Sequence, residues 1–275
     1  MGMESGPLEE KMSFLVMKTD RLKPIMVFML VTLLTAFLPN SAAAQSADEI
    51  VKRADEALKG DRIYSTSRMT VYKSGKAQPV QEMEGYSMEK EGKSYSLSIY
   101  TAPNRMKGTA NLMIEDDLWV RFGSTGRTRK LSSSAKKNSA GGTDFSYADM
   151  GDGGQGISEK YRARLLGDDT VEGEDCYKVE LLAADSDAPY EKMVVFITKE
   201  GFRYLRIDYY EGNANIKSMT LHDFRTVGSK VYPFRQTMEN HTKPSVTVVE
   251  VIKLEMDSSK VQDRLFTIGY LESIR

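Results

Sequence analysis

The sequence contains few of the residues on which hydrolytic and metal-dependent catalysis usually depends. Among its 275 residues are one cysteine, Cys176, and two histidines, His222 and His241. A single cysteine can form no disulfide within the chain. Neither histidine has the spacing of a zinc site or belongs to a nucleophile motif, so a serine or cysteine triad lacks its usual base. We therefore expect that the protein is not an enzyme and that it binds no metal and no cofactor.

An excess of charge of either sign is also missing. The 38 lysines and arginines nearly balance the 39 aspartates and glutamates, which gives a formal net charge of -1. The first 44 residues contain four acids and four bases, so the rest of the chain keeps the same net charge. Because binding to nucleic acid or to an anionic membrane surface usually requires a basic excess, this balance indicates neither partner.

The longest apolar run is near the N-terminal end. Residues 25–38 are apolar, follow a basic segment and are too short for a comfortable membrane span. The alanines at residues 42–44 then supply an A-x-A cleavage pattern. We predict that residues 1–44 are an extended signal peptide cleaved after Ala44, so that the mature protein lies outside the cytoplasm. The alternatives are an uncleaved anchor and a later start codon.

Beyond residue 44 the periodicity predicts one helix followed by many strands. Residues 48–59 place Ile50, Val51, Ala54 and Leu58 on one face at helical spacing. From residue 63 onward, short strand-like runs are separated by turns that contain glycine or asparagine. The expected strands are residues 63–73, 80–90, 93–101, 105–114, 118–122, 127–131, 162–166, 177–182, 192–198, 202–210, 216–225, 230–239 and 246–256.

Consecutive short strands without long helices between them predict one extended antiparallel sheet. A twisted sheet of more than about ten strands tends to curl, split or close. The helix at residues 48–59 and helical turns near residues 144–150 and 158–161 supply too little helix to cover its concave face. The expected fold is therefore mainly β, of the α+β kind, with a large curved antiparallel sheet that forms an open half-barrel covered by a few helices. Residues 45–275 are expected to form a single domain.

Two local patterns that look like ligand sites lack the context that such sites require. Gly151, Gly153 and Gly156 satisfy G-x-G-x-x-G, but no buried parallel strand precedes them and the chain shows no β-α-β alternation. Asp144 and Asp149 lie nearby without the acidic ladder of a calcium loop. We interpret this segment as a loop or lid.

Residues 110–150 combine a strand hairpin with a long polar crossing and an aromatic acidic stretch. They include W-V-R-F-G-S-T-G-R-T-R-K-L-S-S-S at residues 119–134 and G-G-T-D-F-S-Y-A-D-M at residues 141–150. These motifs resemble those of the outer membrane lipoprotein-sorting family, the LolA-like periplasmic lipoprotein carriers. The resemblance extends over nearly all of residues 45–275. It implies a periplasmic half-barrel that binds lipoprotein or lipid acyl chains and transfers them towards the outer membrane, with an inner-membrane exporter or an outer-membrane acceptor as a partner.

Alternation along the strands selects the candidate lining, because no residue can be matched to a cargo-contacting position of that family. The candidates are apolar positions that share one face: Leu118, Val120, Phe122, Met193, Val195, Ile197, Met219 and Leu221. The many methionines in strand runs suit a lining for acyl chains of varied length, and filling an ordinary core is the alternative. We interpret Tyr204 and Tyr209 as cross-strand packing with solvated hydroxyl groups.

A non-catalytic module is the alternative function. The same half-barrel could recognise a polypeptide or an envelope-stress signal, or serve as an accessory subunit of a transporter. A carrier must hold a lipid reversibly in a cavity, whereas an interaction module should have a filled and dry core.

Overall fold

The computed structural model describes residues 45–152, 157–186 and 188–275. Residues 45–275 form one compact unit. The predicted signal peptide and two of the three glycines of the G-x-G-x-x-G pattern, Gly153 and Gly156, lie outside the described residues. Among the residues that are described, no helix is long and apolar enough to cross a membrane.

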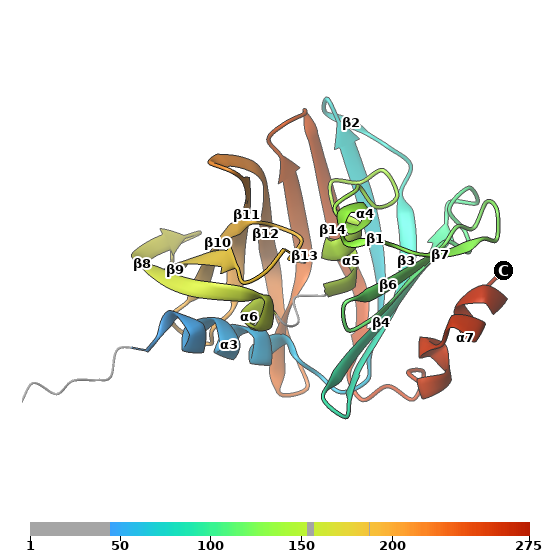
Figure 1. Cartoon of the computed structure of the whole chain (residues 1–275), viewed down its shortest axis with the longest axis horizontal. Helices are drawn as coiled ribbons and strands as arrows, with labels where there is room; N and C mark the ends of the chain where they lie inside the picture. The colour runs from blue at the N-terminus through green and yellow to red at the C-terminus, as the bar shows by residue number, and fades with distance from the viewer. Residues whose placement is uncertain (1–44, 153–156, 187) are drawn as a thin grey trace, which may run out of the picture. The chain divides into compact units, whose positions relative to one another are not determined.

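A fourteen-stranded antiparallel sheet dominates the described residues and confirms the expected fold class (Figure 1). The strands are β1 (Ile63–Lys73), β2 (Lys76–Ala77), β3 (Gln81–Lys90), β4 (Lys93–Ala102), β5 (Ala110–Ile114), β6 (Asp117–Arg121), β7 (Thr128–Lys130), β8 (Tyr161–Val171), β9 (Glu174–Ala183), β10 (Lys192–Thr198), β11 (Tyr204–Glu211), β12 (Ala214–Val227), β13 (Lys230–Asn240) and β14 (Ser245–Glu255). Their order is β7-β6-β5-β4-β3-β1-β14-β13-β12-β11-β10-β9-β8, and β2 pairs only with β1. The sheet is open because its two edge strands, β7 and β8, do not pair with each other.

The strand bounds differ from expectation mainly where turns and edges are involved. Strand β5 begins at Ala110 and not at residue 105, because residues 103–109 form a hydrogen-bonded turn in which the Met106 amide donates to the Pro103 carbonyl at 2.7 Å. Strand β8 continues beyond residue 166 to Val171, since pairing with β9 extends through polar positions that carry no apolar signal.

Helix α3 (Ala47–Leu58) begins where the Ser46 hydroxyl oxygen accepts a hydrogen bond from the Glu49 amide at 3.1 Å. Its apolar stripe of Ile50, Val51 and Ala54 is fully buried, and the helix packs against β8, β10 and β13. Helix α6 (Ile157–Lys160) packs against α3 and β8. This pair of helices covers one part of the inner face of the sheet (Figure 1).

A second group of helices covers the region of β4 and β5. Helix α5 (Tyr147–Asp152) packs against both strands and against the short helix α4 (Ser133–Lys136), which was not predicted because its sequence is a polar serine-rich run. The middle of the inner face therefore lies between the α3–α6 pair and α5.

The opposite face of the sheet is covered at one end by the C-terminal segment, which the sequence analysis did not assign. The 3-10 helix η2 (Asp263–Phe266) and helix α7 (Ile268–Ser273) bury Leu265, Phe266 and Leu271 against β4, β5 and β6. Strand β5 shows how the two faces alternate. Leu112 belongs to this outer cluster, whereas Met113 belongs to an inner cluster that contacts Tyr147 of α5.

Candidate functional site

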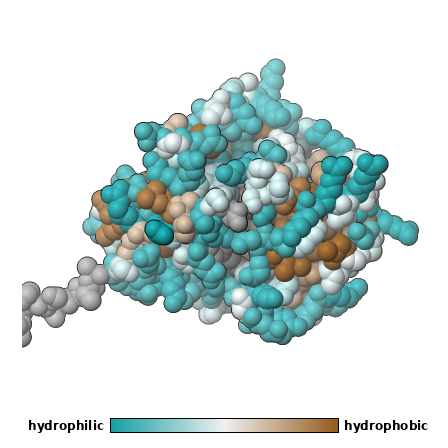
Figure 2. Space-filling view, viewed as in Figure 1, coloured by the Kyte–Doolittle hydropathy of each residue, from teal (hydrophilic) through white to brown (hydrophobic). Residues whose placement is uncertain are grey.

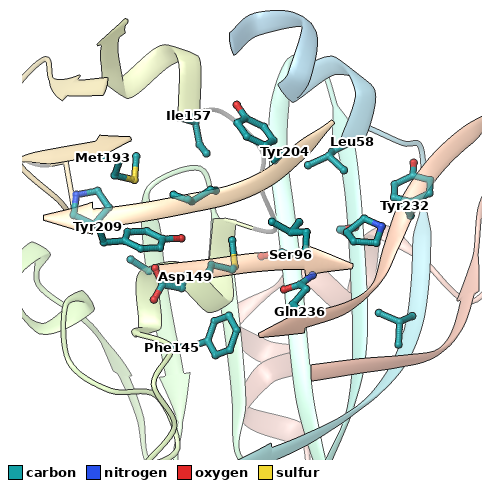
Figure 3. Close-up of a pocket in the computed structure, with 18 of the residues that line it drawn as sticks. Leu58, Ser96, Phe145, Asp149, Ile157, Met193, Tyr204, Tyr209, Tyr232 and Gln236 are labelled. Atoms are coloured by element: carbon teal, nitrogen blue, oxygen red, sulfur yellow. The ribbon is translucent and has the colours of Figure 1, made fainter. Parts of the chain in front are cut away.

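A cavity of about 280 Å³ lies on the inner face of the sheet (Figure 3). Helix α3 contributes Leu58 to its wall, α5 contributes Ala148 and Asp149, and α6 contributes Ile157. The other lining residues come from the strands and from the loops before α5 and β10. Because its walls come from segments as far apart as residues 58 and 254, the cavity exists only in the assembled sheet.

The two sides of the cavity differ in chemistry. On the β10–β12 side the wall is apolar and includes Met193, Ile207, Met219 and Leu221. On the β1, β3 and β4 side it consists of Ile63 and three serines, Ser65, Ser87 and Ser96. An apolar chain with one uncharged polar group matches this division.

The serines also explain why space remains on that side of the cavity. Ser87 and Ser96 lie directly opposite each other on β3 and β4, and Ser65 lies opposite Gly85 on β1 and β3. A Cβ atom added to Gly85 would lie 2.7 Å from the Ser65 hydroxyl oxygen. Because the side chains on three adjacent strands are small here, they leave the space above this part of the inner face unfilled.

The structure brings some of the sequence-selected residues together and separates others. Met193, Met219 and Leu221 line the cavity. Val195 and Ile197 lie on the same face and are fully buried in the main core cluster. The hairpin residues form a separate cluster that contacts α5: Leu118, Val120 and Phe122. Contact of any of these eight residues with a lipid stays a prediction.

The methionines divide in the same way. Met193 and Met219 line the cavity, whereas Met69, Met83 and Met238 are buried in the main core cluster. Met88 even lies on the opposite face of the sheet, in the cluster with α7. For most of the methionines the structure therefore favours the ordinary-core interpretation.

Tyrosines, which the sequence analysis did not select, form a large share of the wall. The lining tyrosines are Tyr161, Tyr190, Tyr204, Tyr209 and Tyr232. Tyr190 and Tyr209 pack with their ring centroids 4.7 Å apart. The expectation of solvated hydroxyl groups is wrong for Tyr204, which is 2% exposed and donates a hydrogen bond to Asp55 Oδ1 at 2.8 Å. Of the lining tyrosines, only Tyr204 and Tyr209 lie on β11, and strict alternation would place them on opposite faces because they are five residues apart. A register shift in the pairing of β10 with β11 brings both to the cavity, and the sequence gives no signal for that shift.

The Asp55 carboxylate connects α3 to the cavity wall. Its side chain is buried. Oδ2 accepts a hydrogen bond from the Ser158 amide of α6 at 2.8 Å, and Oδ1 accepts one from the Tyr204 hydroxyl. Burial raises the pKa of the Asp55 carboxyl above its ordinary value of 3.8, although these hydrogen bonds oppose the shift. Burial, followed by the nearby Asp55 carboxylate, raises the pKa of Tyr204 well above 10.0.

A buried ion pair connects α5 to β12. The Lys217 ammonium donates to Asp149 Oδ2, and the two side chains are 7% and 5% exposed. Asp149 also accepts hydrogen bonds from the Tyr190 hydroxyl at 2.9 Å and from the Ser146 amide at 2.6 Å. The Lys217 ammonium lies 5.0 Å from the ring centroid of Tyr190 and 4.8 Å from that of Tyr209.

This ion pair separates two spaces of different polarity. Asp149 lines the cavity, whereas Lys217 lines a neighbouring polar cleft of about 390 Å³. The two spaces share Pro189 and Tyr190 as lining residues. The ion pair and the Tyr190 ring therefore lie between the apolar cavity and the polar cleft.

One serine–histidine contact appears that the sequence did not predict, but it lacks the geometry of a triad. The Ser218 hydroxyl donates to Asp208 Oδ1 at 2.6 Å and lies 2.9 Å from His241 Nε2. Because its single proton goes to the aspartate, His241 acts as the donor and cannot accept that proton as a base. Arg206 Nε also donates to Asp208 Oδ1, at 2.7 Å. In the described part of the chain, no group of three or more acidic, histidine or cysteine side chains could hold a metal ion.

Comparison with known proteins identifies a family and a fold. A family model described as an uncharacterized protein family matches residues 92–273. No curated protein matches the chain. Solved structures do match, and two of the three described next carry the names of the family that the sequence motifs resemble.

Three of these structures cover 82% of this chain each. A domain assigned to the outer membrane lipoprotein-sorting proteins, from Vibrio parahaemolyticus, has a TM-score of 0.76 and 24% identity, with 98% of that domain covered. A DUF1329 family protein from Desulfovibrio piger has a TM-score of 0.74 and 24% identity, with 97% covered. A LolA superfamily protein from Nitrosomonas europaea has a TM-score of 0.69 and 22% identity, with 100% covered. These matches confirm the fold that the sequence resemblance implied.

Proposed function

This chain belongs to the uncharacterized-protein family that its sequence matches and has the fold of the LolA superfamily, and on that basis we propose that it is a periplasmic carrier of acyl chains. In this proposal the cavity binds the acyl chains of a lipoprotein or lipid without catalysis. The protein then transfers them towards the outer membrane. An inner-membrane exporter would load it and an outer-membrane acceptor would receive its cargo.

The single observation that carries the proposal is the cavity on the inner face. An interaction module would have a filled inner face, but here about 280 Å³ of space lies beside the apolar side chains of Met193, Ile207, Met219 and Leu221. Each methylene buried in such a space contributes roughly 0.8 kcal/mol. Reversible binding of an acyl chain therefore needs no charged contact.

The size of the cavity implies that binding involves a movement. Small-molecule sites typically occupy roughly 300–1,000 Å³, so this cavity lies just under that range. A complete acyl chain requires α5 or α3 to move away from the sheet. Helix α5 is the better candidate, because it has six residues and Ala148 is the one buried apolar side chain among those described, whereas α3 has twelve residues and buries Ile50, Val51 and Ala54.

Native mass spectrometry tests the proposal directly. The secreted protein is purified without detergent, and its mass is measured before and after incubation with lipoprotein or phospholipid micelles. We expect an added mass that yields acyl chains on fragmentation. A protein that keeps its own mass in both measurements would overturn the carrier and support the interaction module.

Two adjacent residues of β12 provide a matched pair of variants. Met219 and Thr220 are both half-buried, but Met219 lines the cavity and Thr220 points to the opposite face. Met219→Glu should abolish the added mass because it places a charge in the apolar wall, and Thr220→Glu should retain it. Thermal denaturation of both variants shows whether the loss comes from the cavity or from unfolding. Val195→Glu, at a fully buried core position, should unfold the protein.

A further inference from the structure

The near-zero net charge hides an uneven distribution. Residues 118–143 contain six lysines and arginines and no acid. The turn at residues 103–109, between β4 and β5, contains Arg105 and Lys107 and likewise no acid. The acids between them in the sequence, residues 115–117, lie at the other end of β5 and β6.

Strand pairing brings these basic segments together at one corner. The β4–β5 turn and the β6–β7 turn contact each other, since the Gly123 amide donates to the Thr109 hydroxyl at 3.1 Å. Arg121 Nη1 donates to the Gly108 carbonyl at 2.6 Å. The C-terminal residue joins them, because a Cβ atom on Gly108 would lie 3.2 Å from the Arg275 carbonyl carbon.

The cations at this corner are available to a partner. Five of them are exposed and form no ion pair with any residue in the described ranges: Arg105, Lys107, Arg127, Arg129 and Arg275. The neighbouring Lys130 differs, because it pairs with Asp117 at 2.6 Å. The segments that form the corner, residues 103–109, 122–129 and 274–275, contain no aspartate or glutamate. We call these five residues the basic corner.

The basic corner projects and does not line a groove. In Figure 1 the two turns and the C-terminus lie together on the side of β7 and α7, and Figure 2 shows hydrophilic side chains extending from the same side. Neither the apolar cavity nor the polar cleft includes any of the five cations in its wall. A convex group of arginines without a pocket suits a flat anionic surface more than a shaped ligand.

We propose that the basic corner docks the protein on a membrane surface rich in anionic phospholipid. Four of its five residues are arginines, whose planar guanidinium groups bind phosphate in a bidentate manner. A lipid surface presents mobile phosphates in a plane and so needs no matched shape, unlike an acidic protein. The inference goes beyond acyl-chain binding, and it would bring a carrier to a bilayer without any contact from the cavity.

Vesicle flotation tests the docking. The secreted protein is mixed with vesicles of phosphatidylcholine alone or with an equal part of phosphatidylglycerol. We expect binding only to the anionic vesicles. Binding should be lost at about 0.3 M salt, because salt screens the attraction between the exposed cations and the lipid phosphates. The test variant replaces four of the cations by glutamine: Arg105, Lys107, Arg127 and Arg129.

A matched variant controls for the change in total charge. It replaces four exposed lysines, away from the corner, that form no ion pair with any described residue: Lys52, Lys73, Lys76 and Lys93. Each basic residue at an anionic surface contributes about fivefold to partitioning. The corner variant should therefore bind at least about tenfold more weakly than the control variant.

Three results would overturn the proposal: no binding of the unmodified protein at low salt, equal binding to both kinds of vesicle, or equal losses in the two variants. The first of these would redirect the search to an acidic protein partner. Native mass spectrometry on the corner variant separates this proposal from the proposed function. Retained cargo with lost docking supports the corner, whereas retained docking in this variant overturns it whatever happens to the cargo.

Discussion

Replacing Lys217 with methionine should destabilise the protein by about 3–5 kcal/mol, because it leaves the Asp149 carboxylate buried without its counter-ion. Both side chains are less than a tenth exposed, so water can replace the lost partner only poorly. The Tyr190 hydroxyl and the Ser146 amide still donate to the carboxylate, which favours the lower end of this range. Methionine keeps the packing against the tyrosine rings, so little of the cost should come from a cavity.

A second substitution should recover much of this loss. In Lys217→Met/Asp149→Asn the buried charge is gone. The side-chain oxygen of the introduced asparagine can accept from the Ser146 amide, and its amino group can donate to the Tyr190 hydroxyl oxygen. Removing both charges of a buried pair is usually far cheaper than removing one. We expect the double variant to be at least about 2 kcal/mol more stable than Lys217→Met.

Urea denaturation of the unmodified protein, both single variants and the double variant completes the cycle. The coupling free energy is the quantity that decides. A loss of stability under about 1 kcal/mol for Lys217→Met, with no coupling to Asp149, would refute the reasoning, because an exposed ion pair contributes no more than that. Total stability of a domain is only about 5–15 kcal/mol, so the single variant should be measured at low temperature and low urea.

Two further substitutions test the inner helix and the corner. Asp55→Asn should cost more stability at about pH 4 than at about pH 7. The pKa of Asp55 is raised in the folded state, so its protonation adds stability that is fully present below the unfolded pKa of 3.8 and is lost as the pH rises through the folded pKa. Asparagine does not titrate, so the variant gains none of this stability at low pH. Urea denaturation at both pH values checks this, and equal costs would contradict it. Gly123→Ala should cost about 1–3 kcal/mol, because its Cβ would lie 2.3 Å from the Lys107 carbonyl oxygen. Gly269→Ala, whose Cβ meets nothing within 4 Å, is the control in a thermal denaturation series, and equal melting temperatures would argue against the contact.

Secondary structure was largely predictable because it depends on neighbours within a few residues. Strands β1 and β10 occupy the residues expected from their alternation, and α3 differs from the predicted helix by one residue at each end. The C-terminal helices were missed, because α7 is only six residues long and buries a single leucine, Leu271. A helix this short gives little periodic signal, and its stability comes from packing on the sheet.

The candidate site was predictable only in part. Alternation selected Met193, Met219 and Leu221, which line the cavity, but it also selected the fully buried Val195 and the distant Leu118. Alternation identifies which residues share a face of one strand. It does not show where on that face other strands leave space, and so it could not indicate the tyrosines or the serines.

The sequence by itself determined the strand periodicity, the scarcity of catalytic residues and a net charge of -1. The tertiary structure decided the location of the cavity and the separation of charge into a basic corner. Strand pairing places Ser65 opposite Gly85. It also brings the turn that contains Arg105 into contact with the turn that contains Arg127. Such positions depend on the register between strands far apart in the chain, and no local pattern of residues contains that register.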